Sequence, residues 1–98
     1  MRYHFEWDPS KDRSNRVKHG VGLRQAPPVF RDPMAVSVYD EDHSLDEDRW
    51  LTIGQISGGT LLVVAHTFRQ IDAENTVIRL ISARRPTPLE RRQYEEES

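Results

Sequence analysis

The segment from Leu61 to Phe68 most limits what this chain can fold into, because it is apolar on both sides of an extended backbone. Successive side chains of a strand point to opposite faces, which separates Leu61, Val63, Ala65 and Thr67 from Leu62, Val64, His66 and Phe68. A strand with two apolar faces is typical of the middle of a sheet. The segment therefore predicts a sheet built around residues 61–68.

Turn signals and short apolar runs divide the rest of the chain into further elements. Asp8 can accept hydrogen bonds from the free N–H groups of a helix start, and Pro9 suits the first helical position. Gly20 offers a left-handed stop, so we expect a helix between Pro9 and His19. Pro27 and Pro28 disfavour helix just before each ring, which predicts a shortened or broken second helix. The other expected strands are Tyr3 to Trp7, Ala35 to Tyr39, Arg49 to Ile56 and Val77 to Ala83, and a last helix is expected from Leu89 to Glu96.

The order of these elements indicates the fold class. One strand and two helices precede four consecutive strands, whose short connections favour antiparallel pairing. We therefore expect one α+β domain over residues 1–98, with an antiparallel sheet of about four to five strands, two short N-terminal helices and one C-terminal helix.

Composition points to a reducing compartment. Cysteine is absent, which excludes disulfides and thiolate chemistry. The first eight residues lack the apolar stretch of a signal peptide, and the apolar run Leu61 to Ala65 is too short to cross a bilayer. We expect a cytoplasmic protein with no membrane partner.

Charge is unevenly distributed along the chain. The formal net charge is −2, but residues 11–31 hold six Lys and Arg against the single acid Asp12, and residues 69–92 hold six arginines against three acids. Acids gather in residues 40–48 and 95–97. Local basic surface can bind RNA despite a negative total, although scattered, solvated arginines remain an alternative. The acidic stretch Asp40 to Asp48, with His43, lacks the oxygen spacing of a calcium loop and suits a solvated turn or a flap that repels RNA.

Two short signatures at opposite ends of the chain carry a family resemblance. The first is Phe5-Glu6-Trp7-Asp8 running into Asn15-Arg16-Val17-Lys18-His19-Gly20-Val21, and the second is Arg79-Leu80-Ile81-Ser82-Ala83-Arg84-Arg85 followed by Glu90-Arg91-Arg92 and Tyr94. Together they resemble the BrnT family of small bacterial toxins. The resemblance implies a RelE-like ribonuclease fold and metal-independent cleavage of cellular RNA that inhibits translation. It also implies neutralisation by a BrnA-like ribbon-helix-helix antitoxin in a two-to-two complex, which binds operator DNA only through the antitoxin. The pair Pro27-Pro28 departs from the family pattern, in which the second helix runs uninterrupted.

Ribonuclease chemistry without a metal or other cofactor needs a base near the ribose 2′-hydroxyl, an acid near the leaving oxygen and cations for the added negative charge. The candidate catalytic residues are His66, Arg79, Lys18 and His19, and the candidate substrate-binding residues are Lys11, Arg69, Arg84 and Tyr94. Helical spacing places Lys11, Asn15, Lys18 and His19 on one face of the first helix.

Several of these residues have a structural alternative. His66 can be a hydrogen-bonded histidine of the sheet, and His19 can complement the dipole of its helix. Arg79 either pairs with a carboxylate such as Glu6 or Asp40 or binds phosphate, and strict alternation puts Arg84 on the opposite side of its strand. Tyr94 can anchor the last helix. For the whole chain, the alternative to an enzyme is a non-catalytic RNA- or protein-binding module.

Overall fold

The computed structural model describes residues 1–97, so Ser98, the last residue of the expected domain, lies outside the described part. Its strands are β1 (Arg2–Glu6), β2 (Val36–Tyr39), β3 (Trp50–Gln55), β4 (Leu61–Gln70) and β5 (Asn75–Arg84). Its α-helices are α1 (Pro9–His19) and α2 (Pro88–Glu97), and its short 3₁₀ turns are η1 (Leu23–Gln25), η2 (Pro27–Arg31), η3 (Glu41–His43) and η4 (Ser57–Gly59). No helix within residues 1–97 has the length and apolar character that crossing a membrane requires.

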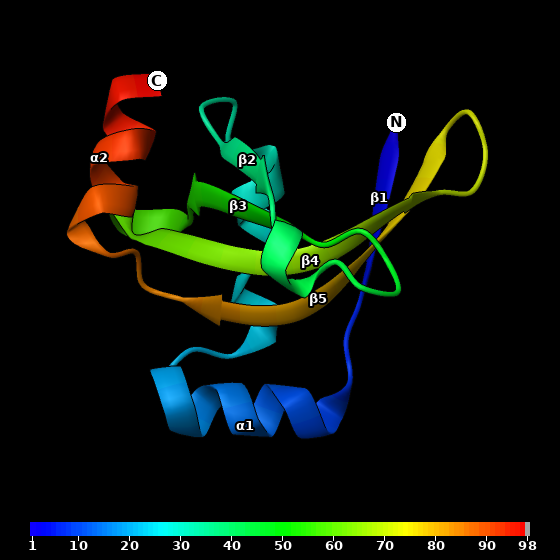
Figure 1. Cartoon of the computed structure of the whole chain (residues 1–98), viewed down its shortest axis with the longest axis horizontal. Helices are drawn as coiled ribbons and strands as arrows, with labels where there is room; N and C mark the ends of the chain where they lie inside the picture. The colour runs from blue at the N-terminus through cyan, green and yellow to red at the C-terminus, as the bar shows by residue number, and fades with distance from the viewer. Residues whose placement is uncertain (98) are drawn as a thin grey trace.

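The strands form one five-stranded sheet in the order β1-β5-β4-β3-β2, which confirms the α+β class (Figure 1). The sheet is mixed rather than wholly antiparallel, because β1 runs parallel to β5 while the other neighbours are antiparallel. A tight hairpin turn cannot connect two parallel strands, so the chain must cross over between β1 and its partner. Helix α1 lies in this crossover. The strand predicted to be central, β4, lies in the middle of the order.

The predicted helix boundaries are largely confirmed. Asp8 caps α1 by accepting from the backbone N–H of Ser10, and Gly20 ends the helix in the left-handed region at φ 69°. The second helix is reduced to η1 and η2, which meet at Ala26 just before Pro27. In α2, Thr87 and Glu90 cap the helix reciprocally: the Thr87 N–H donates to the Glu90 carboxylate at 2.9 Å, and the Glu90 N–H donates to the Thr87 hydroxyl at 3.2 Å.

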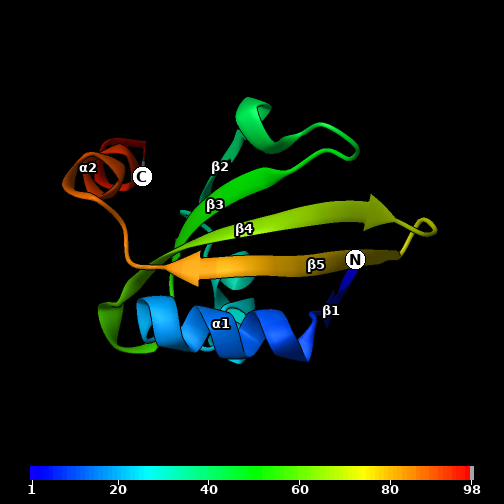
Figure 2. The ribbon, with the colours of Figure 1, turned by 60° about the horizontal axis from the view of Figure 1, so that its bottom comes forward.

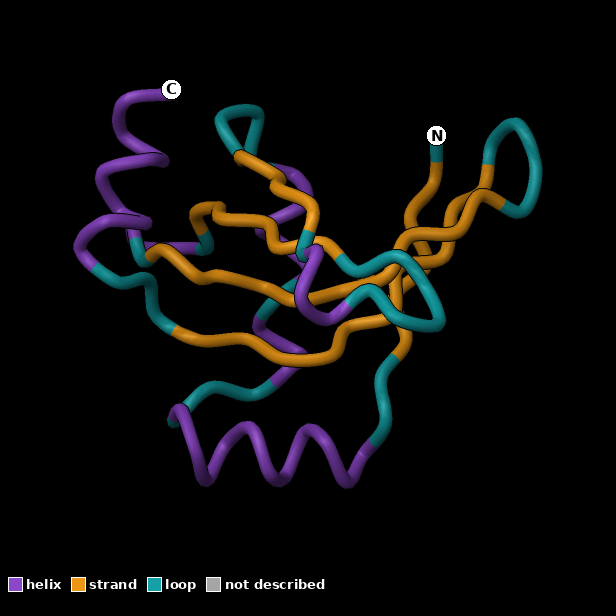
Figure 3. Tube along the Cα trace, viewed as in Figure 1, coloured by secondary structure: helices purple, strands orange, loops and turns teal. Residues whose placement is uncertain are grey.

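One face of the sheet, here called the core face, is covered by η1 and η2. Buried side chains of β4 and β5 pack on this face against the segment 21–29. The strands contribute Leu62, Val64, Ile78, Leu80 and Ala83, and the segment with η1 and η2 contributes Val21, Leu23, Ala26 and Val29. The other face, here called the open face, carries η3 and the loop between β2 and β3 (Figure 3). The core face of the sheet is therefore packed against the hydrophobic core, and part of the open face is accessible to solvent.

A bulge in β5 decides which side chains reach the open face. Ser82 pairs with Ala65 and Leu80 pairs with His66, so Ile81 is an extra residue without a partner in the register. After the bulge Ala83 joins the core face, and Arg84 joins the open face together with Arg79. The expectation that Arg84 lies opposite Arg79 was therefore wrong, because strict alternation takes no account of an inserted residue.

Gly54 of β3 is where η2 comes closest to the sheet. A Cβ at this position would lie 2.7 Å from Cγ1 of Val29 and 2.9 Å from its carbonyl oxygen. The second of these atoms is backbone and cannot rotate away, so only glycine lets η2 pack directly on β3.

We expect Gly54→Ala to destabilise the domain by about 1–3 kcal/mol, because η2 must move outward or β3 must distort. Urea unfolding monitored by tryptophan fluorescence measures the change. Gly22→Ala is the matched control, since its added Cβ would meet its nearest atoms at an ordinary 3.5–3.6 Å. Equal stability of the two variants would contradict the close approach.

Candidate functional site

Two adjoining cavities form a groove on the open face. The first, of about 210 Å³, lies between α1 and β5, and the second, of about 450 Å³, crosses β4 and β3 to the loop after β2. Both are lined by Ile81 and Ser82, so they adjoin at the bulge of β5. Figure 2 shows α1 below β5 and the β2–β3 loop above β3, with β5 and β4 between them.

The first wall of the groove is the polar face of α1. Lys11, Asn15, Lys18 and His19 all line the cavity, which confirms that they share one helix face. Asn15 lies at its base, 5% exposed, where its amide nitrogen donates to the carbonyls of Val21 and Ala83, both at 2.7 Å. Its amide oxygen accepts from the Ala83 N–H at 3.1 Å. Asn15 thus fixes the wall to the sheet, while the lysines and His19 stay exposed.

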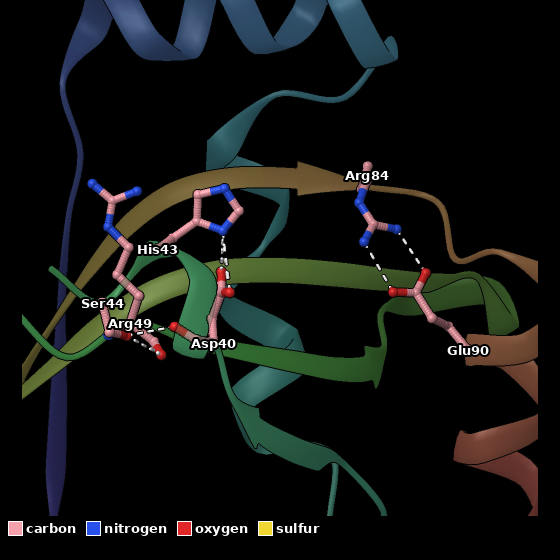
Figure 4. Close-up of polar contacts among 6 residues, drawn as sticks. All are labelled: Asp40, His43, Ser44, Arg49, Arg84 and Glu90. Carbon is pink, nitrogen blue, oxygen red and sulfur yellow. Dashed lines mark hydrogen bonds and ion pairs between the residues drawn. The ribbon is translucent and has the colours of Figure 1, made fainter.

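Arg84 extends from β5 into the second cavity, where the carboxylate of Glu90 holds it. Two guanidinium nitrogens donate to the two carboxylate oxygens at 2.7 and 2.9 Å (Figure 4). The hydrogen bonds from Arg84 are the largest cause that lowers the pKa of Glu90 to about 2. Because Glu90 also caps α2, the last helix and the direction of the Arg84 side chain are fixed by the same carboxylate.

The far wall is formed by the start and end of the β2–β3 loop. Asp40, Asp42, His43 and Arg49 line the second cavity. The hydroxyl of Ser44 closes the loop by donating to the carbonyl of Asp40 at 2.6 Å and accepting from the N–H of Arg49 at 2.9 Å. His43 and Arg49 were absent from the candidates drawn from the sequence, where the only signal was an imidazole three residues after Asp40.

Arg79 and Arg69 lie on the open face beside a neighbouring cavity of about 300 Å³. Arg79 forms an ion pair with Glu47 of the β2–β3 loop. Of the two expected outcomes for Arg79, pairing with a carboxylate is therefore observed, but the partner is neither Glu6 nor Asp40. The loop supplies this partner because it extends back over the sheet from β2.

His66 lies on the core face and does not share the groove with Lys18 and His19. It is 4% exposed, its Nε2 lies 2.7 Å from the hydroxyl of Thr52, and its ring packs edge-on against Phe30 at 4.7 Å between centroids. Burial lowers the pKa of His66 below its ordinary value of 6.5. These contacts match the alternative of a hydrogen-bonded histidine within the sheet.

Tyr94 connects α2 to the segment that follows η2. Its hydroxyl donates to the Asp32 carboxylate at 2.6 Å, and this hydrogen bond is the largest cause that raises the pKa of Tyr94 to about 12. Asp32 also accepts from the N–H groups of Met34 and Gln55. Tyr94 therefore anchors the last helix, outside the groove.

The groove thus gathers basic side chains, imidazoles, a hydroxyl and, on the far wall, the carboxylates of Asp40 and Asp42 on a partly apolar floor. Within residues 1–97, no group of three or more His, Asp or Glu side chains is arranged to hold a metal ion. The side chains present can bind an anion of extended shape and transfer protons along it.

Comparison with known proteins agrees with this chemistry. A family model described as the ribonuclease toxin BrnT of type II toxin–antitoxin systems matches residues 7–90. The match covers most of the chain and includes both walls of the groove. A comparison with curated proteins gave no match.

The buried imidazole of His66 should make stability depend on pH. An unfolded His66 takes up a proton near pH 6.5, while the folded protein resists protonation because its pKa is lowered. Stability is therefore full above that pH and falls as pH decreases from 6.5 toward the lowered folded value.

His66→Gln should remove this contribution. The variant should therefore lose less stability than the wild type between about pH 8 and about pH 5. Urea unfolding at several pH values measures it. His4→Gln alters an exposed imidazole and should retain the wild-type pH dependence. If His66→Gln also kept it, the imidazole would not be responsible.

Proposed function

Since the chain belongs to the family of BrnT ribonuclease toxins of type II toxin–antitoxin systems, we propose that it cleaves single-stranded RNA bound along the groove. The reaction is attack of a ribose 2′-hydroxyl on the adjacent phosphate, without a metal ion. The observation that supports this most directly is the groove itself, which has basic side chains on one wall, a fixed arginine at its end and imidazoles on both sides.

The basic groups suit a chain of phosphates. Lys11, Lys18 and His19 are exposed on the α1 wall, where a polyanion can contact them without a large conformational change. Arg84 is held in place by Glu90 through its two terminal nitrogens, and its remaining guanidinium N–H groups can donate to a phosphate oxygen. Leu51 and Ala65 form an apolar part of the floor, which strengthens electrostatic interactions near it.

Arg69 and Arg79 extend the path of the RNA beyond the groove. Both border the neighbouring cavity on the same face, so phosphates further along the strand can reach them. Arg79 becomes available when Glu47 releases it, and both partners are sufficiently exposed for that exchange, with side chains 40% and 44% accessible. The acidic loop therefore competes with RNA at this end.

The family implies both an RNA substrate and an antitoxin partner. In our proposal the antitoxin is BrnA-like, dimerises through a ribbon-helix-helix domain and bridges two copies of this chain. Operator DNA is bound by the antitoxin alone. The free toxin acts in the cytoplasm, where RNA cleavage inhibits translation.

The purified chain should cleave single-stranded RNA in the presence of EDTA and leave a 2′,3′-cyclic phosphate or its hydrolysed product. Mass spectrometry of the fragment ends identifies these products. Loss of cleavage with EDTA that magnesium restores would overturn the metal-free mechanism. Failure to cleave any RNA, with or without ribosomes, would favour the non-catalytic binding module.

The double substitution Lys11→Glu with Lys18→Glu should weaken RNA binding and reduce its salt dependence, because each lost phosphate contact lowers the slope of log K against log salt by about 0.7 for a single strand. Fluorescence anisotropy with a labelled oligonucleotide at several salt concentrations measures both effects. Arg13→Glu is the control, because Arg13 is exposed and does not line the groove. If Arg13→Glu weakened binding equally, RNA would bind by overall charge and not at the α1 wall.

A further inference from the structure

The imidazole of His43 is positioned over the groove by a turn that backbone and side-chain hydrogen bonds close. Asp40 follows β2 and its N–H donates to the carbonyl of Arg49 at 2.9 Å, so the loop is closed at its base. Ser44 bonds to both of these residues (Figure 4). His43 lies in η3, between two segments that the Ser44 hydroxyl ties together. A ring held in this way keeps a defined position relative to the floor of the groove.

Asp40 and His43 form a dyad with unequal exposure. Nδ1 of His43 lies 2.9 and 3.1 Å from the two carboxylate oxygens of Asp40. The Asp40 side chain is only 16% exposed, whereas that of His43 is 66% exposed. A carboxylate can only accept, so Nδ1 carries the hydrogen and Nε2 of the neutral ring keeps its lone pair. Asp40 therefore orients an imidazole whose basic nitrogen is accessible.

Cationic groups lie beside this dyad. Arg49 lines the same cavity as His43, and among the described residues its Nε is buried without a hydrogen-bond partner. A buried donor without a partner is unfavourable, and a movement of the Arg49 side chain toward the cavity would let a phosphate oxygen satisfy it. Figure 4 shows the side chains of His43, Arg49 and Arg84 on the same face of the sheet. Across the shared floor of Ile81 and Ser82 lies His19 on the α1 wall.

We propose that His43, oriented by Asp40, is the general base of RNA cleavage and that Arg49 stabilises the charge that develops on the phosphate. This inference rests on the proposed ribonuclease function. Nε2 of His43 takes the proton of the 2′-hydroxyl, the 2′ oxygen forms a bond to phosphorus, and the bond from phosphorus to the 5′ oxygen breaks. The 5′ oxygen leaves with a proton from the imidazolium of His19. The products are a 2′,3′-cyclic phosphate and a 5′-hydroxyl, and proton exchange with water returns His43 to the neutral imidazole and His19 to the imidazolium.

Single-turnover cleavage with a short RNA, measured over a range of pH, tests the dyad. His43→Ala should slow cleavage by at least about 100-fold while RNA affinity changes little, and added imidazole should restore part of the rate. Asp40→Asn should slow cleavage and alter the limb of the pH profile that belongs to the base, because an amide can stabilise the wrong tautomer. The charged groups around His43 are Asp40, Asp42, Asp46, Glu47 and Arg49 from its own loop and Arg84 from β5.

His4→Ala is the matched control, because His4 is an exposed imidazole on β1 that bonds to Asn75 and does not line the groove. It should cleave at the wild-type rate. Wild-type cleavage by His43→Ala would overturn the dyad and leave the ribonuclease function standing. A slow His43→Ala protein that binds RNA poorly and does not respond to imidazole would also overturn it, since His43 would then support only the loop. A wild-type chain that cleaves no RNA would overturn the proposed function and the dyad together.

Discussion

The position of the groove depends on the side chain of one buried asparagine. β1 pairs with β5 only from Asn75 to Arg79, so the backbone of β5 beyond that point has a free edge. Asn15 hydrogen-bonds to this free edge at Ala83, because its primary amide presents a donor and an acceptor as a neighbouring strand would. Through this contact an otherwise polar helix is attached to the sheet without a broad apolar stripe. The lysines of α1 face the open side of the sheet as a result.

The α+β class, the central β4 and the limits of α1 could be predicted from residue patterns, because periodicity, proline and glycine act locally. The parallel pairing of β1 with β5 could not, since it joins segments far apart along the chain and depends on the path of α1. The inserted Ile81 was also beyond prediction, because bulges leave no composition signal. Yet this single residue decides that Arg84 shares a face with Arg79.

The sequence could predict the types of residue that line the candidate site, and only part of its location. The α1 wall followed from helical spacing, and alternation correctly grouped His66 with Leu62 and Val64. Which face of the sheet the turns would cover depends on the packing of Val29 on Gly54, and no local pattern gives that. His43 was not predicted as a site residue, because its acidic neighbours indicated a solvated turn. Only the closure of the loop by Ser44 places it over the groove.

The pairing of the first strand with the last also determines when the protein can begin to act during its synthesis. Asn15 and Ala83 are 68 residues apart in sequence, and β1 has no partner until β5 exists. A ribosome makes the chain from its N-terminus, so α1 emerges long before the strand on which it rests, and contacts of such sequence separation form late in folding. The groove, with Arg84 fixed by Glu90, is therefore completed only after residue 90 has been translated. Until then the nascent chain has α1 but neither the strand on which it rests nor the ion pair that fixes Arg84.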